Sequence, residues 1–355
     1  MLYGIILLEV KYMDKIFFFS DNTSGVHPRI MQALVDGNQH HARSYGNDEY
    51  SKKAKEMITE IMGKECYTVF VLGGTGGNIL ALDAMMSSYE ALICADCCHI
   101  HTTETSAFEK IVGAKIYTTT SKNGKINLEE AKQYLLENKG NIHHNQPRVI
   151  SIAQTTEFGT VYTIEEIREI CDFAHNNGLY VHVDGARISN ALTYLNCTLK
   201  EMIADTNVDV LTFGGTKNGM MFGEANVYFN QEFYMKSCFL QKQNLQLLSK
   251  MRYIPISFIA YLEKNLYLEI ANTANQLMYV FKESVTDLQD VELLYPIESN
   301  QAFLRIPTRL SNKLINKYEY AISKEENGHT ELRFVTSFIN TLEEVNELIR
   351  DLKGY

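Results

Sequence analysis

The stretch "LYVHVDGARISNALTYLNCTLKEMIADTNVDVLTFGGTK", residues 179–217, contains two apolar strands separated by helical sequence. The first strand ends at Asp184, and Arg187 follows three residues later. Two glycines break the second strand, and Lys217 lies in the turn behind them. A right-handed crossover makes the two strands parallel, so both end at the same edge of one sheet. The sequence therefore predicts that a carboxylate, a guanidinium and an amine meet at that edge. An internal ion pair between Asp184 and Arg187 is the structural alternative.

The same alternation of strands and helices extends from about Cys66 to Phe229. The segments predicted as strands are "CYTVFVLGG", "EALICAD", "RVISIAQ", "LYVHVD", "VDVLTFG" and "EANVYF". The helical segment "TIEEIREICDFAHNNG" begins with a capping box of Thr163 and Glu166 and ends at Gly178. Such alternation is typical of an α/β fold, a mainly parallel sheet with helices on both faces. We expect its ligand beyond the carboxyl ends of the strands.

The pattern changes after about Gln231. The sequence is helical to about Val285, and Pro255 divides it into two or more helices. Two short strands, "FLRIP" and "ELRFVTS", and a last helix, "TLEEVNELIRDLKGY", follow. We expect three parts: an N-terminal arm of residues 1–30, a large domain of residues 31–255, and a smaller C-terminal α+β domain of residues 256–355.

Composition excludes several classes of function. The 355 residues are 45% hydrophobic and 21% charged, as in ordinary globular proteins. A net charge of -10 argues against nucleic acid and anionic membranes as partners. The odd number of cysteines, seven, is typical of reduced thiols in the cytosol. The N-terminal apolar run from Ile5 to Leu8 is too short to span a bilayer and is a poor signal peptide, and Met13 is an alternative start.

A glycine-rich segment, "VLGGTGGNILAL", residues 71–82, lies between a predicted strand and a predicted helix. Backbone N–H groups and a helix N-terminus suit an anion there, with the Thr75 hydroxyl beside them. The segment is no Walker A loop, and Ile79 stands where a dinucleotide-binding motif needs its third glycine. A tight turn would explain one or two glycines but not four, which favours a phosphate cradle.

The segment "CADCCHIHTTE", residues 94–104, holds side chains of the metal-ligating types. It lacks a second Cys or His pair at zinc-ribbon spacing, so we predict no metal site. His99 follows a predicted strand and lies on the same edge as Asp184. Its imidazole can stack on a flat ring or move protons, or it can be a buried structural histidine.

These features together fit one cofactor, pyridoxal 5′-phosphate, which carries an anion, a ring nitrogen and an aldehyde. Lys217 would bind the aldehyde covalently, helped by burial that lowers the pKa of an amine. Asp184 would keep the ring nitrogen protonated and so strengthen the electron sink. The glycines before Lys217 would let the chain pass close to the cofactor.

The motifs resemble those of the L-threonine aldolase and β-eliminating lyase family of fold-type I pyridoxal-phosphate enzymes. The resemblance extends from about Phe19 to the C-terminus. It rests on "SDNTSGVHPRIMQAL", "SYGNDEYS", "GGTGGN", "CHIHTTE", "HVDGARISNA" and "ELRFVTS", of which "HVDGARISNA" is the most specific.

The resemblance implies a role for each candidate residue. The phosphate segment supplies Gly74, Thr75 and Asn78, and the ring is bound by His99, Asp184, Arg187 and Lys217. The substrate carboxylate is bound by Ser20, Arg187 and Arg333. Catalysis is assigned to Lys217 and His99.

The resemblance also implies an aspartate-aminotransferase-like fold and a homodimer or homotetramer with active sites between subunits. The implied reaction is the reversible aldol cleavage of L-threonine, L-allo-threonine and related β-hydroxy-α-amino acids to glycine and an aldehyde. A β-elimination would use the same residues. A non-enzymatic Cys/His metal-binding protein is the alternative of another class.

The sequence departs from the family pattern after the strand "RVISIAQ". Many members carry Asn-Thr-His-Asn there, whereas this chain has "QTTEFGTVY", with Glu157 near the missing histidine. Gly73 and the "TKNG" turn are further departures. The group that takes the hydroxyl proton therefore stays open between His99, a water molecule and Glu157.

Overall fold

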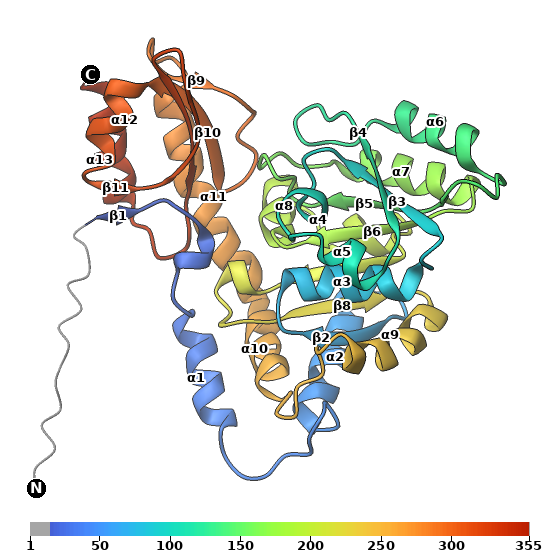
Figure 1. Cartoon of the computed structure of the whole chain (residues 1–355). Helices are drawn as coiled ribbons and strands as arrows, with labels where there is room; N and C mark the ends of the chain where they lie inside the picture. Colours follow the sequence, from blue (N-terminus) through green and yellow to red (C-terminus); the bar gives the residue numbers. More distant parts are fainter. Residues whose placement is uncertain (1–14, 355) are drawn as a thin grey trace, which may run out of the picture.

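The computed structural model describes residues 15–354. The apolar run from Ile5 to Leu8 and the alternative start Met13 lie outside the described residues. Within residues 15–354, no helix is long and apolar enough to cross a membrane. Two sheets dominate the architecture and lie in different parts of the molecule (Figure 1).

The larger sheet has seven strands in the order β2-β8-β7-β6-β5-β3-β4. Their bounds are β2 (Tyr67–Val71), β3 (Glu90–Ala95), β4 (Lys115–Thr119), β5 (Gln146–Ala153), β6 (Tyr180–Gly185), β7 (Val210–Gly214) and β8 (Glu224–Tyr228). β8 is antiparallel to both of its neighbours, and the other pairs are parallel. β6 and β7 are adjacent, with Asp184 opposite Thr212. This confirms the predicted mainly parallel α/β fold; β4 was not among the segments predicted as strands.

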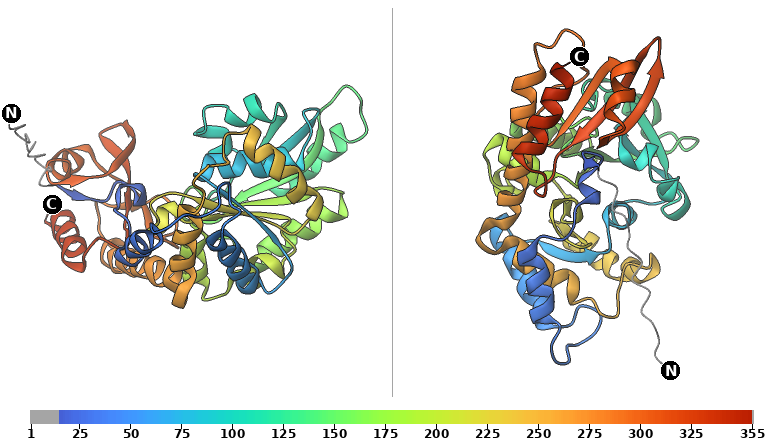
Figure 2. Two further views of the ribbon diagram at one scale, coloured as in Figure 1. Left: turned by 90° about the horizontal axis from the view of Figure 1, so that it is seen from below. Right: turned by 90° about the vertical axis from the view of Figure 1, so that its left-hand side faces the viewer.

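Helices cover both faces of this sheet, as the two views of Figure 2 show. The helices are α2 (Glu49–Met62), α3 (Gly74–Met85), α4 (His99–Thr102), α5 (Ala107–Ile111), α6 (Leu128–Asn138), α7 (Ile164–Asn176), α8 (Ile188–Leu195), α9 (Gln231–Gln243) and α10 (Tyr253–Leu262). Alternate residues of the strands contribute to two separate cores, because successive side chains point to opposite faces. Val181 and Leu211 belong to one core, Leu92 and Val210 to the other.

Local sequence explains where several helices begin. Thr163 accepts a hydrogen bond from the Glu166 N–H, and the Glu166 carboxylate accepts one from the Thr163 N–H, the predicted capping box of α7. Pro255 lies in the first turn of α10, where a missing N–H costs no hydrogen bond. Between α8 and β7 the chain forms one short π-helical turn at Lys200–Ala204.

The smaller sheet is antiparallel, in the order β12-β13-β10-β9. This region consists of α11 (Leu266–Val285), β9 (Glu292–Leu293), β10 (Gln301–Pro307), α12 (Thr308–Leu314), β11 (Tyr318–Glu319), β12 (Ala321–Glu326), β13 (His329–Val335) and α13 (Leu342–Lys353). Its core joins Phe281, Leu304, Phe334 and Leu348. The predicted strand pair and final helix are therefore present.

The N-terminal segment packs on this smaller core. β1 (Ile16–Phe17) pairs with β11, and Phe18 belongs to the same core as Phe334. The chain then continues into α1 (Pro28–Gly37), which packs on α10 (Figure 1). The division into three parts at residues 30 and 255 stays a prediction.

Gly214, at the end of β7, is crowded by main-chain atoms. A Cβ atom there would lie 2.6 Å from the carbonyl oxygen of Ala186 and 2.7 Å from that of Gly185. Because these are main-chain oxygens of the last residue of β6 and of the residue after it, no side-chain rotation relieves the contact. We predict that Gly214→Ala lowers the free energy of unfolding by about 2 kcal/mol or more, measured by urea denaturation. Gly25→Ala is the control, since its Cβ would meet only an ordinary contact at 3.9 Å from Ile339; equal stability of both variants would contradict the crowding argument.

Candidate active site

One pocket lies at the carboxyl edge of the parallel strands and is partly open to solvent. Its lining comprises Gly74, Thr75, Asn78, His99, Ala153, Thr155, Thr156, Glu157, Asp184, Ala186, Arg187 and Lys217. The structure therefore brings together every residue that the sequence predicted as cofactor-binding. Ser20 and Arg333 do not line this pocket.

The N-terminus of α3 forms one wall. The helix begins at Gly74, and its first N–H groups have no partner within the helix. A Cβ atom at Gly73 or Gly74 would meet no neighbour within 4 Å, so this end faces open space. At Gly77 it would lie 2.7 Å from Thr212, because α3 packs tightly on β7 there. Two properties thus explain the glycines: an exposed helix end that suits an anion, and close packing one turn later.

Asp184 is buried, with 8% of its surface exposed. Its Oδ1 accepts the Ala186 N–H at 3.0 Å, and its Oδ2 accepts a hydrogen bond from Asn78 Nδ2 at 2.8 Å. Asp184 does not form the ion pair with Arg187 that was the structural alternative. Arg187 pairs with another carboxylate instead. Asp184 is thus held by amide donors rather than neutralised by a cation.

That other carboxylate is Asp21, which reasoning from the sequence missed. Arg187 Nε and Nη2 donate to its two carboxylate oxygens at 2.7 and 2.8 Å, a bidentate pair. Burial of Asp21 acts to raise its pKa, but Arg187 outweighs this and the pKa lies below its usual value. Asp21 is adjacent to Ser20 in the quoted "SDNT" segment, so its position was visible but its partner, 166 residues away, was not.

Ser20 and Arg333 lie around this ion pair. The Ser20 hydroxyl accepts the Asn22 N–H at 3.2 Å, capping a short 3-10 turn that holds Asp21. Arg333 Nη2 donates to the Phe19 carbonyl at 3.3 Å. Arg333 Nε is buried and has no hydrogen-bond partner among the described residues. Burial, and then the charge of Arg187, lower the pKa of Arg333.

His99 faces the pocket from the start of α4. Its Nδ1 lies 2.8 Å from Glu104 Oε1, and the Glu104 side chain is 0% exposed. The hydrogen bond to Glu104 raises the pKa of His99 above its ordinary value, against the effect of burial. Asn78 Nδ2 also donates to Glu104 at 3.2 Å. Glu104 ends the quoted "CHIHTTE" segment, yet nothing in the sequence distinguished it from a surface carboxylate.

Lys217 occupies a 3-10 turn, Thr216–Asn218, directly after β7. Its pKa is lowered, first by the charge of Arg187 and then by burial. We expected burial alone to act, so the neighbouring guanidinium is an additional cause. A lowered pKa increases the fraction of neutral amine, the form that attacks an aldehyde.

The glycines before Lys217 also have a packing reason, and their predicted close approach to the cofactor stays a prediction. Gly214 abuts the turn after β6, and a Cβ at Gly215 would overlap the Met220 sulfur. Behind them, the buried Glu224 accepts the Gly215 N–H. Burial raises the pKa of Glu224 to about 7. Glu224 opens the strand "EANVYF", where a carboxylate in a buried strand was a signal that we did not use.

The cysteines near His99 are free thiols. Cys94 and Cys98 sulfurs lie 2.7 Å apart in the buried region behind the pocket. Within residues 15–354, no group of three or more His, Cys, Asp or Glu side chains is arranged to hold a metal.

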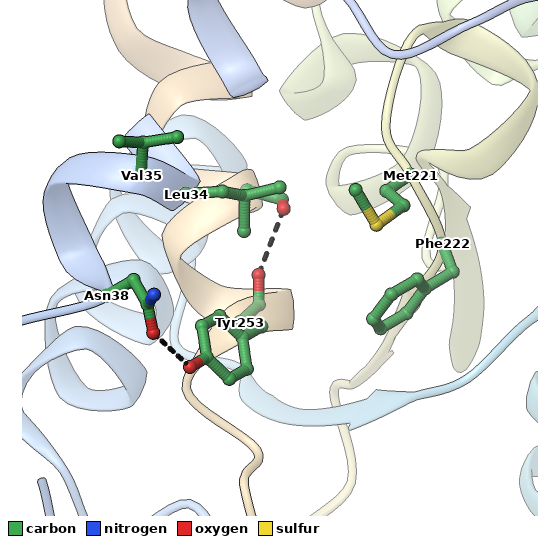
Figure 3. Close-up of a pocket in the computed structure, with 7 residues that line it drawn as sticks. Leu34, Val35, Asn38, Met221, Phe222 and Tyr253 are labelled. Atoms are coloured by element: carbon green, nitrogen blue, oxygen red, sulfur yellow. Dashed lines mark hydrogen bonds between the residues drawn. The ribbon is translucent and has the colours of Figure 1, made fainter. Parts of the chain in front are cut away.

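A second cavity, shown in Figure 3, lies between α1, α10 and the loop after Lys217. Its lining is Leu34, Val35, Asn38, Met221, Phe222, Tyr253 and Ser257. The Tyr253 hydroxyl donates to Asn38 at 2.6 Å (Figure 3). This lining offers no carboxylate, amine or imidazole, so we place the chemistry at the carboxyl edge of the sheet instead.

A turn lysine, a strand-end carboxylate and a helix N-terminus at one edge of a seven-stranded sheet define the fold-type I class of α/β enzymes. An archaeal alanine:glyoxylate aminotransferase shares this fold, with a TM-score of 0.68 at 17% identity, covering 96% of this chain and 90% of that one.

Proteins that are more similar to this chain identify its family within the class. The model of the beta-eliminating lyase family matches residues 18–330. The low specificity L-threonine aldolase of Pseudomonas aeruginosa is 35% identical over 338 residues, which is 95% of this chain and 96% of the relative. The structure of Leishmania major threonine aldolase superposes with a TM-score of 0.91 at 29% identity, covering 96% and 99% of the two chains. The chain belongs to the beta-eliminating lyase family and is a lyase.

Proposed function

We propose that the protein catalyses the reversible aldol cleavage of L-threonine and related β-hydroxy-α-amino acids to glycine and an aldehyde. The observation that carries this proposal is the position of Lys217 in one pocket with Asp184 and the N-terminus of α3. The relatives named as threonine aldolases, which match nearly the whole chain, support it.

We propose pyridoxal 5′-phosphate as the cofactor, and the pocket fits it. The α3 N-terminus suits the phosphate through Gly74 and Thr75, and Lys217 suits the aldehyde. The buried Asn78 Oδ1 has no hydrogen-bond partner among the described residues, as expected of an atom that awaits a ligand. When bound, the cofactor supplies an electron-accepting ring that stabilises negative charge on the substrate α-carbon.

Each protein group then has a defined task. Asp184, oriented by Asn78 and the Ala186 N–H, would hold the protonated ring nitrogen. His99, held by Glu104, would lie against the ring. The neutral fraction of Lys217 would bind the aldehyde until the amino acid replaces it.

Ser20, Arg187 and Arg333 would bind the substrate carboxylate. The Arg333 Nε without a partner among the described residues supports this assignment, because a guanidinium matches a carboxylate in shape. Arg187 gives Nε and Nη2 to Asp21, which leaves its Nη1 to donate to the substrate. A carboxylate held in this way would fix the orientation of the substrate in the pocket.

A β-elimination is the second candidate, favoured by the name of the matching family. Products separate the two reactions. Purified, cofactor-loaded protein mixed with L-threonine should release glycine and acetaldehyde in equal amounts. Release of ammonia and a 2-oxo acid in their place would contradict the aldolase assignment.

We also propose a cytoplasmic homodimer or homotetramer with active sites between subunits. The free cysteines support a reducing compartment. Size-exclusion chromatography with light scattering measures the assembly.

Arg333→Lys should lower kcat/KM for L-threonine by roughly tenfold or more, since lysine cannot form a bidentate pair and ~1.4 kcal/mol equals a factor of ten. The absorbance of the bound cofactor should stay unchanged, because Lys217 and Asp184 are untouched. Arg29→Lys is the matched control, as Arg29 is in an exposed ion pair with Glu269. If both variants stay within about twofold of the parent protein, Arg333 does not bind the carboxylate.

A further inference from the structure

Glu157 is a half-buried carboxyl in the pocket wall to which the proposed cofactor contacts assign no role. It follows β5 and lines the same pocket as Lys217 and Asp184. Its Oε1 accepts the backbone N–H of His99 at 2.8 Å. Its Oε2 accepts a contact from the Cys97 thiol at 3.9 Å, and a thiol is a weak donor. The backbone N–H groups of His99 and of Glu157 itself therefore hold the carboxyl, whereas the thiol holds Oε2 only weakly.

The loop that carries Glu157 is held on both sides. The Thr156 and Thr160 hydroxyls are 2.7 Å apart and hydrogen-bonded. Phe158 stacks on Tyr295, which lies between β9 and β10, with ring centroids 4.1 Å apart and planes 4° from parallel. The carboxyl is thus held in the pocket wall by a rigid loop, as a group that must meet a substrate atom requires.

The surroundings of Glu157 and of His99 have different effects on their ability to accept a proton. Burial raises the pKa of Glu157 to about 7, so near neutral pH it can both take and return a proton. His99 has its pKa raised by Glu104, which favours imidazolium. The His99 Nδ1 is also already paired with Glu104, whereas Glu157 Oε2 has only a weak thiol contact. The geometry therefore favours Glu157 over His99, the other side chain that the sequence left open.

We propose that Glu157 is the catalytic residue that accepts the β-hydroxyl proton of the substrate during cleavage and returns it during synthesis. The inference rests on the proposed aldol cleavage. The O–H bond breaks and its electron pair forms the aldehyde carbonyl, while the pair of the Cα–Cβ bond stays with the α-carbon. That carbon takes up one proton to become glycine, and Glu157 releases the proton it gained, so protons balance.

Several groups act on the titration of Glu157. They are His99 and Cys98 at α4, Cys97 in the turn before it, Asp184 on β6, and Tyr162 after the loop. Since Glu157 must be deprotonated to act, kcat/KM of the parent protein should fall as the pH drops through about 7. In a variant that lacks the Glu157 carboxyl, kcat/KM should no longer fall in this pH range.

Two variants and two reactions test the proposal. Glu157→Gln keeps the shape but cannot accept a proton, whereas Glu157→Asp keeps the acid. Glu169→Gln, an exposed position on α7, is the control. We expect Glu157→Gln to cleave L-threonine at least ~100-fold more slowly, and Glu157→Asp to recover part of the loss. Exchange of the glycine α-hydrogen in deuterated water involves no hydroxyl proton, so it should stay within about threefold.

A third measurement does not need the cofactor. In the infrared spectrum of the cofactor-free protein, the difference between parent and Glu157→Gln should show a carboxylic-acid band that disappears as the pH rises through about 7.

The proposal would be overturned if Glu157→Gln cleaved L-threonine within about threefold of the parent rate. It would also be overturned if cleavage and exchange were lost equally, because that result would mean that Glu157 positions the cofactor. If the parent protein exchanges the glycine hydrogen but cleaves no β-hydroxy amino acid, the proposed function itself fails, and that result is separate from any variant.

Discussion

Lys217→Ala should lower kcat/KM for L-threonine by at least about a thousandfold, ~4 kcal/mol of transition-state stabilisation. Lys217 is the amine in the pocket, and its lowered pKa, caused by Arg187 and burial, makes it the nucleophile toward an aldehyde. Without it the cofactor would be held only by its phosphate and ring contacts. The rate is measured as acetaldehyde released by cofactor-saturated protein.

The covalent attachment is tested directly by borohydride reduction and peptide mapping, which should find the pyridoxyl group on Lys217. Lys53→Ala, at an exposed position on α2, should lose neither activity nor label. A label on another lysine, or unchanged turnover of Lys217→Ala, would refute the assignment.

Asp184→Asn should lower turnover by about a hundredfold or more, because a neutral amide cannot favour the protonated ring nitrogen. The variant also has a structural cost. Asp184 accepts hydrogen bonds from both Asn78 and the Ala186 N–H, and an asparagine has one acceptor oxygen for these two donors. We expect the free energy of unfolding to fall by ~1–3 kcal/mol.

Two measurements separate these effects. Cofactor content, from the absorbance of the purified variant, shows whether the pocket still binds it. Asp184→Glu keeps the charge but displaces it, so it should retain more turnover than Asp184→Asn at equal cofactor content. Near-normal turnover of loaded Asp184→Asn would remove Asp184 from this role.

Much of the sheet and the pocket was predictable because the relevant signals are local. Asp184, Arg187 and Lys217 each follow an apolar strand within a few residues, and the crossover rule places those strands side by side. The N-terminus of α3 was likewise visible as glycines between a strand and a helix.

The pairings within the pocket were not predictable in the same way. Arg187 had a carboxylate three residues away, yet it pairs with Asp21, which reaches it from a segment attached to the smaller core. The reason is geometric: Asp184 Oδ1 and Oδ2 already accept amide hydrogens, and only the folded chain brings Asp21 within reach. Gly214 shows the same limit, since its crowding neighbour Ala186 comes from the turn after another strand.

The amide of Asn78 has a consequence for how the pocket senses protons. Its nitrogen donates one hydrogen to Asp184 at 2.8 Å and the other to Glu104 at 3.2 Å, so both amide hydrogens are used. Glu104 in turn holds His99. A proton on His99 and a ligand bound opposite Asp184 are therefore coupled through Asn78 and Glu104, and reciprocity requires each to change the affinity for the other by the same factor. A titration of His99 followed by nuclear magnetic resonance would then report the occupancy of the site opposite Asp184.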